Sequence, residues 1–119
     1  MPPLRIVFAG SPAAAVPSLR RLATGPHRVI AAVTRDDAPL GRKRVMTATP
    51  VAVEAERQGI PLVKANRLGP VSDELVTLGA DLGVVVAYGG LIREPLLSAP
   101  RLGWINLHFS LLPRWRGAA

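Results

Sequence analysis

Leu4-Arg5-Ile6-Val7-Phe8-Ala9 is an apolar run that ends at Gly10. Such a run predicts a buried strand, and Gly10-Ser11-Pro12 predicts a tight turn out of it. A helix is predicted from about Ala14 to Ala23, since Pro17 falls in its first turn, where proline is tolerated. Val29 to Thr34 is a second apolar strand. A strand, a helix and a strand within about thirty residues predict a right-handed parallel crossover.

The fold class that follows is α/β, with a Rossmann-like, open, mostly parallel sheet and helices on both faces. Both strands are apolar throughout, without alternation, which is typical of strands covered on both sides. The first turn is not Gly-x-Gly-x-x-Gly, because Ala13-Ala14-Ala15 stand where that fingerprint needs glycine. A dinucleotide cofactor is therefore disfavoured.

The rest of the chain gives a coarse order of elements. His27 is predicted to lie on the surface without a role. Further predictions are an irregular segment from Arg35 to Thr49, a helix from Thr49-Pro50 to about Gln58 that Gly59 stops, a short edge strand at Pro61-Leu62-Val63, a partly helical stretch from Asn66 to Thr77, a central strand from Asp81 to Ala87, a short helix from Glu94 to Ser98 and a strand from Gly103 to His108.

The last of these strands carries the candidate catalytic residues. Side chains alternate along a strand, so Asn106 and His108 share one face, with Cα atoms roughly 7 Å apart. Asn offers a neutral hydrogen-bond donor and acceptor, and His can move a proton near neutral pH. Carboxyl ends of parallel strands share one edge of a sheet, where ligands bind. Gly10, Thr34, the Tyr88-Gly89-Gly90 turn and His108 are all predicted at that edge.

Composition limits the possible functions. The 119 residues fit one domain, and 49% hydrophobic residues suffice for a core. The chain has no cysteine and two histidines far apart, which excludes disulfides and disfavours a metal site. No apolar run approaches the roughly 20 residues of a membrane span, and no signal peptide pattern opens the chain. A cytoplasmic protein is the expectation.

The net charge of +7 indicates an anionic partner without saying which one. Arg42-Lys43-Arg44 lies in the long segment after the second strand. Three adjacent cations in a loop suit contact with a phosphate backbone, and a solvated basic loop is the equally simple alternative.

The motif Asn106-x-His108-x-Ser110-Leu111-Leu112-Pro113 resembles the signature of the 10-formyltetrahydrofolate-dependent formyltransferases. Val7 to Pro12, Val16 to Leu19, Val84 to Gly89 and Leu111 to Ala119 are similar to the methionyl-tRNA branch of that family. Gly90 stands where the family more often has Gln.

The resemblance implies a reaction and its residues. It implies transfer of a formyl group from 10-formyltetrahydrofolate to the amino group of initiator methionyl-tRNA, in translation initiation. Asn106 and His108 would be catalytic, and the backbone of Ser110, Leu111, Leu112 and Pro113 would contact the folate. Arg42, Lys43 and Arg44 would contact the tRNA. No metal is implied, because the folate already carries the formyl group.

The resemblance also implies that residues 1–119 are the N-terminal part of a catalytic, folate-binding domain. The family's third catalytic group is an Asp downstream of the closing motif, and a C-terminal β-barrel domain that helps to hold tRNA follows it. Neither is present in these 119 residues, so we expect this stretch to be inactive alone.

Two other functions stay open. The first is a formyltransferase acting on a small amine, such as a nucleotide sugar or a purine precursor, although Arg-Trp-Arg-Gly-Ala-Ala at the end favours the tRNA branch. The second is a basic RNA-binding α/β module, for which an aromatic content of 4% gives few platforms for base stacking.

Overall fold

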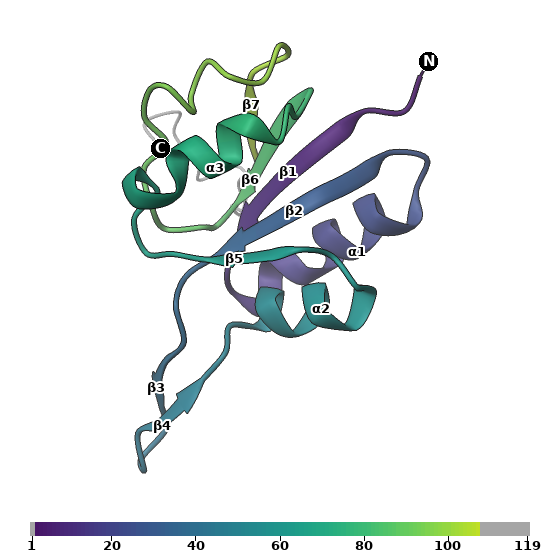
Figure 1. Cartoon of the computed structure of the whole chain (residues 1–119). Helices are drawn as coiled ribbons and strands as arrows, with labels where there is room; N and C mark the ends of the chain where they lie inside the picture. The colour runs from purple at the N-terminus through teal and green to yellow at the C-terminus, as the bar shows by residue number, and fades with distance from the viewer. Residues whose placement is uncertain (1, 108–119) are drawn as a thin grey trace, which may run out of the picture.

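The computed structural model describes residues 2–107, and their centre is one parallel sheet (Figure 1). Its five strands stand in the order β5-β2-β1-β6-β7, and every neighbouring pair is parallel. The strands are β1 (Arg5–Gly10), β2 (Arg28–Thr34), β5 (Leu62–Lys64), β6 (Leu82–Val86) and β7 (Trp104–Leu107). The predicted α/β fold with a parallel sheet is confirmed, including β5 at an edge.

Strand β1 is the middle strand, and its residues from Ile6 to Ala9 are fully buried. It pairs with β2 on one side and with β6 on the other. The glycine at its end is required by the close approach of β6. A Cβ on Gly10 would lie 2.7 Å from the carbonyl oxygen of Val86, closer than any side chain tolerates. The pattern that predicted a strand ending at Gly10 therefore also marks where β1 and β6 converge.

Helices cover both faces of the sheet, as Figure 1 shows. Helix α1 (Val16–Thr24), preceded by the 3-10 turn Ala13–Ala15, and helix α2 (Pro50–Gln58) lie on one face. Helix α3 (Ser72–Thr77) and the segment that follows β6 lie on the other. Each face has its own core, because alternate residues of β1 point to opposite sides. Ile6 and Phe8 belong to the α1–α2 side, and Val7 and Ala9 to the α3 side.

Helix α2 shows why local sequence predicted its bounds well. The Thr49 hydroxyl accepts a hydrogen bond from the backbone N–H of Ala52 at 3.0 Å, and Pro50 occupies the first turn. At the other end Gly59 adopts a left-handed φ of 72°, which glycine reaches without steric cost. Cap, proline and terminal glycine are encoded within a few residues of the helix itself.

Three sequence predictions need correction. The segment from Arg35 to Thr49 is not irregular, because β3 (Ala38–Leu40) and β4 (Val45–Thr47) form an antiparallel hairpin. Glu94 to Ser98 is a series of turns and not a helix. His27 has a structural role, because its Nδ1 accepts a hydrogen bond from the backbone N–H of Leu4 at 2.9 Å.

Gly83 in β6 has no room for a side chain, because the indole of Trp104 in the neighbouring strand packs against it. A Cβ at position 83 would lie 2.2 Å from Cε3 of that ring. We expect Gly83→Ala to lower the free energy of unfolding by about 1–3 kcal/mol, the range for overpacking a core. Urea denaturation measures this loss, with Gly69→Ala as a control, since a Cβ on Gly69 meets nothing within 4 Å. Equal stability of the two variants would contradict the prediction.

Glu54 is a buried carboxylate on α2 that accepts hydrogen bonds from three side chains, two of which are cationic. Its oxygens accept hydrogen bonds from Arg20 (3.0 Å), Arg57 (2.7 Å) and Gln58 (2.9 Å). The bonds from Arg20, then Arg57 and Gln58, hold the pKa of Glu54 far below its usual value. The cluster ties α1 to α2 over the first face of the sheet.

The lowered pKa of Glu54 predicts a loss of stability in acid. A carboxyl whose pKa is lower in the folded state stabilises the fold above its unfolded pKa of about 4.3, and less as the pH falls below it. Glu54→Gln should therefore be less stable than the original chain at pH 7, with the difference shrinking towards pH 2. Urea denaturation at both pH values tests this, with the exposed Glu56→Gln as a control. A difference that does not depend on pH would refute it.

Between residues 2 and 107, no helix has both the length and the apolar character needed to cross a membrane.

Candidate functional site

The carboxyl ends of the strands form the candidate site. Strand β1 ends at Gly10, β2 at Thr34, and β6 at Val86, just before the Tyr88-Gly89-Gly90 turn. Because the sheet is parallel, these ends lie at one edge, as the sequence predicted. The β3–β4 hairpin leaves the sheet from this same edge and projects away from it (Figure 1). His108 lies outside the described residues.

Asn106 lies in β7 with its side chain exposed. It pairs in register with Val85 of β6, and Trp104 with Gly83, so Asn106 shares the face of the sheet that carries Trp104 and α3. The intervening Ile105 and the following Leu107 are on the α1 side, where they are also exposed. The Asn106 amide therefore reaches solvent at the end of an edge strand of the described sheet, on the α3 face.

The turn after β6 has an unusual backbone. Ala87 and Gly89 have φ values of 53° and 94°, a region that only glycine adopts freely. The Tyr88 side chain is buried, and its hydroxyl donates to the carbonyl oxygen of Ala65. Burial raises the pKa of the Tyr88 phenol above its ordinary value. Gly90 has no room for a side chain, because a Cβ there would lie 2.4 Å from the Tyr88 ring.

A buried hydroxyl holds this turn to the centre of the sheet. The Ser11 Oγ atom donates to the carbonyl oxygen of Tyr88 at 3.1 Å, and Thr34 Oγ1 lies 3.4 Å from Ser11 Oγ. Sequence reasoning placed Ser11 in a turn and missed this contact. The one available signal was a hydroxyl residue directly after a buried strand, and the next strand likewise ends in a hydroxyl residue, Thr34.

The predicted tRNA-contacting residues lie at the tip of the hairpin. Arg42, Lys43 and Arg44 occupy the turn between β3 and β4, and all three are exposed. Arg44 has a positive φ of 54°. Two of the exposed apolar side chains of the hairpin, Leu40 and Met46, are 65% and 63% exposed. The structure thus gathers three cations and an apolar surface on one projecting element.

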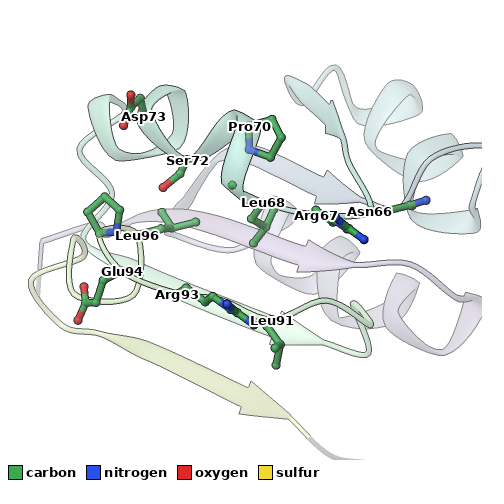
Figure 2. A pocket seen from close by; sticks show the side chains of 12 residues that line it. Asn66, Arg67, Leu68, Pro70, Ser72, Asp73, Leu91, Arg93, Glu94 and Leu96 are labelled. Atoms are coloured by element: carbon green, nitrogen blue, oxygen red, sulfur yellow. The ribbon is translucent and has the colours of Figure 1, made fainter.

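A pocket of about 810 Å³ lies on the α3 face of the sheet, which is within the range of small-molecule sites. Figure 2 shows it between the start of α3 and the segment after β6. The Ser72 hydroxyl is buried there and has no hydrogen-bond partner among the described residues. The lining residues are Asn66, Arg67, Leu68, Gly69, Pro70, Ser72, Asp73, Leu91, Arg93, Glu94, Pro95 and Leu96. This pocket shares the face on which Asn106 lies.

Five of the predicted site residues lie outside the described part of the chain. Ser110, Leu111, Leu112 and Pro113 lie outside the described residues, together with His108. Within residues 2–107, no group of three or more His, Cys, Asp or Glu side chains is arranged to hold a metal ion.

Comparison with known proteins identifies the kind of domain. The family model described as Formyl transferase matches residues 4–119. The chain is 67% identical over 117 residues to a methionyl-tRNA formyltransferase of Clavibacter sepedonicus, covering 98% of this chain and 38% of that protein. It is 52% identical to the methionyl-tRNA formyltransferase of Acidothermus cellulolyticus, covering 98% and 36%. The chain therefore spans a little over a third of the length of these relatives.

Solved structures share the fold. Glycinamide ribonucleotide transformylase 1 from Symbiobacterium toebii superposes with a TM-score of 0.64 at 22% identity, covering 98% of this chain and 56% of that one. The corresponding protein from Geobacillus kaustophilus gives a TM-score of 0.59 at 27% identity, covering 99% and 64%. The family model and the solved structures therefore match nearly the whole chain. This chain belongs to the formyl transferase family.

Proposed function

We propose that this chain is the N-terminal part of a methionyl-tRNA formyltransferase, which transfers a formyl group from 10-formyltetrahydrofolate to the amino group of initiator methionyl-tRNA. The observation that carries the proposal is the family match over residues 4–119, joined to 67% identity with the Clavibacter sepedonicus enzyme. The exposed Asn106, at the carboxyl end of an edge strand of the described sheet, supports the assignment of the site.

The proposed chemistry needs few groups. The methionyl amine attacks the formyl carbon, and the carbonyl oxygen becomes an oxyanion in a tetrahedral intermediate. The Asn106 amide donates a hydrogen bond to that oxygen, a contribution of roughly 3–4 kcal/mol in comparable sites. His108 takes the proton that the amine loses and returns one to the folate nitrogen as the carbon–nitrogen bond breaks. Ser110 to Pro113 contact the folate through their backbone.

The described residues have features that suit a folate-type formyl donor. The pocket beside Leu91 is large enough for a flat ring and is partly apolar, through Leu68, Leu91 and Leu96.

The basic hairpin supports tRNA as the acceptor. Arg42, Lys43 and Arg44 project from the same edge of the sheet that carries the site. Guanidinium groups bind phosphate well, because their planar donors match its oxygens. We propose that the hairpin contacts the tRNA while the acceptor end approaches Asn106. A cytoplasmic location follows from this role in translation.

A chimera tests the function. Residues 1–119 would replace the matching 117-residue segment of the Clavibacter sepedonicus enzyme. The purified chimera should formylate methionyl-tRNA with 10-formyltetrahydrofolate at a rate within about tenfold of the parent enzyme, measured as labelled formylmethionyl-tRNA. Absence of transfer by a folded chimera would refute the proposal.

A formyltransferase acting on a small amine is the second candidate, favoured by the structural similarity to glycinamide ribonucleotide transformylases. The same chimera, given free amines such as a nucleotide amino sugar or a purine precursor, separates the two. Faster transfer to a small amine than to methionyl-tRNA would favour it. Salt-dependent RNA binding by residues 1–119 without any folate binding would instead favour a basic RNA-binding module.

A further inference from the structure

Arg35, the first residue after β2, contacts the carboxyl edge of the sheet through both its backbone and its side chain. Its backbone N–H donates to Ser11 Oγ at 3.2 Å. Its Nη1 atom donates to the carbonyl oxygen of Gly89 at 3.1 Å. The guanidinium also packs against that glycine, because a Cβ on Gly89 would lie 3.2 Å from Nη1 and 3.4 Å from Cδ. Arg35 therefore joins the end of β2 to the turn after β6.

Two successive carbonyl oxygens of that turn are held from different strands. Ser11, after β1, donates to the carbonyl of Tyr88 at 3.1 Å, and Arg35, after β2, donates to the carbonyl of Gly89. The turn needs such support, because Ala87 has a positive φ of 53°, which is unfavourable for a residue with a side chain. Without these donors the peptide units on either side of Gly89 would be free to rotate.

A chain of hydroxyl groups also connects the turn to Thr49, on the far side of the hairpin from Arg35. Thr34 Oγ1 lies 3.4 Å from Ser11 Oγ and 2.5 Å from Thr49 Oγ1. Each hydroxyl has one proton, and the Ser11 proton goes to the carbonyl of Tyr88. Thr34 must then donate to Ser11, and Thr49 to Thr34, while Thr49 accepts from the N–H of Ala52. Arg35 and Thr49, which flank the hairpin, are thus both connected to the turn.

We propose that Arg35 is a positioning residue for formyl transfer. It fixes the Tyr88-Gly89-Gly90 backbone, which directly precedes Leu91 in the lining of the proposed donor pocket, relative to the start of the hairpin proposed to contact the acceptor. This inference rests on the proposed function, and it assigns a supporting role to the residue that directly follows β2. The charge of Arg35 strengthens its hydrogen bond to the Gly89 carbonyl.

Kinetics of the chimera test the role of Arg35. Arg35→Met keeps most of the side chain's length and removes its donors. We expect it to raise the KM for 10-formyltetrahydrofolate roughly tenfold, the scale for losing a hydrogen bond to a charged group. The KM for methionyl-tRNA and the melting temperature should stay close to those of the unsubstituted chimera. Arg35→Lys, which keeps one cationic donor, should recover at least half of the lost donor affinity on a logarithmic scale.

Arg5→Met is the matched control. The Arg5 guanidinium also donates to backbone carbonyls, those of Leu78 (2.7 Å) and Gly79 (3.4 Å), but at the amino end of the sheet. It should leave both KM values unchanged. An unchanged donor KM in Arg35→Met, or an equal rise in Arg5→Met, would overturn the positioning role.

The two proposals fail in different ways. If the unsubstituted chimera does not formylate methionyl-tRNA, the proposed function fails, and the dissociation constant for tetrahydrofolate, measured by calorimetry, then tests Arg35. Binding that is weakened roughly tenfold by Arg35→Met and not by Arg5→Met supports the positioning role. Equal binding by all three proteins, or no binding at all, rejects it.

Discussion

Replacing either Asn106 or His108 by alanine in the active chimera should lower kcat at least roughly 100-fold, the scale for losing an oxyanion donor or an acid–base group. Asn106→Ala removes a donor that acts only when the carbonyl oxygen becomes negative, so kcat should fall while the KM for each substrate changes little. His108→Ala removes the group that moves the proton between the two nitrogens. Initial rates at saturating folate and methionyl-tRNA measure both effects.

The other histidine provides the control for this prediction. His27 lies at the amino end of β2, where its Nδ1 accepts from the backbone of Leu4, and has no place in the chemistry. His27→Ala should therefore change kcat by no more than about twofold, apart from any loss of stability. Near-normal turnover of both Asn106→Ala and His108→Ala would remove the site assignment. Circular dichroism shows whether each variant is folded.

Neutralising the hairpin tip should also have a large effect. The triple variant Arg42→Gln, Lys43→Gln, Arg44→Gln removes three exposed cations from one turn. If each contacts a phosphate, the slope of log(kcat/KM) for methionyl-tRNA against log[salt] should become shallower by about 3. If the two proteins are equally active at 1 M salt, this slope difference corresponds to a loss in kcat/KM on the order of 1,000-fold at 0.1 M salt. The KM for the folate should not change.

A control for charge alone is available on the opposite edge. Arg21 and Arg28 are exposed and lie towards the amino ends of the strands, away from the hairpin. Their joint replacement by glutamine should shift the salt slope by less than 1. If this variant and the tip variant lose affinity in proportion to the charge removed, the attraction is general, and the hairpin has no special role.

Much of the fold was predictable, because the signals are local. The apolar runs predicted all five strands of the main sheet, and Thr49, Pro50 and Gly59 predicted the ends of α2. The hairpin was missed for a physical reason. Its strands have three residues each, and all their side chains are exposed, so no alternation of burial marks them. The pairing that defines it is a backbone property, which side-chain patterns do not report.

The site was predictable only in part. The sequence predicted that Asn106 lies on a strand near the carboxyl edge, and the structure places it there, exposed. The contacts of Ser11 and Arg35 with the turn after β6 were not predictable. They join residues that are 77 and 54 positions apart and depend on β1 standing between β2 and β6. Strand order is a tertiary property, and a single sequence does not encode it in any local pattern.

The place of β1 in the sheet has a consequence for biosynthesis. β1 is made first, and β2 pairs with it soon afterwards, but Gly10 finds its partner on the other side only when Val86 has been synthesised. At 5–20 residues per second, the ribosome needs roughly 4–15 s to cover that interval. During this time the edge of β1 that later pairs with β6 has no partner strand, and other nascent chains can pair with it. We therefore expect newly made chains to depend on chaperones at the ribosome until β6 has emerged.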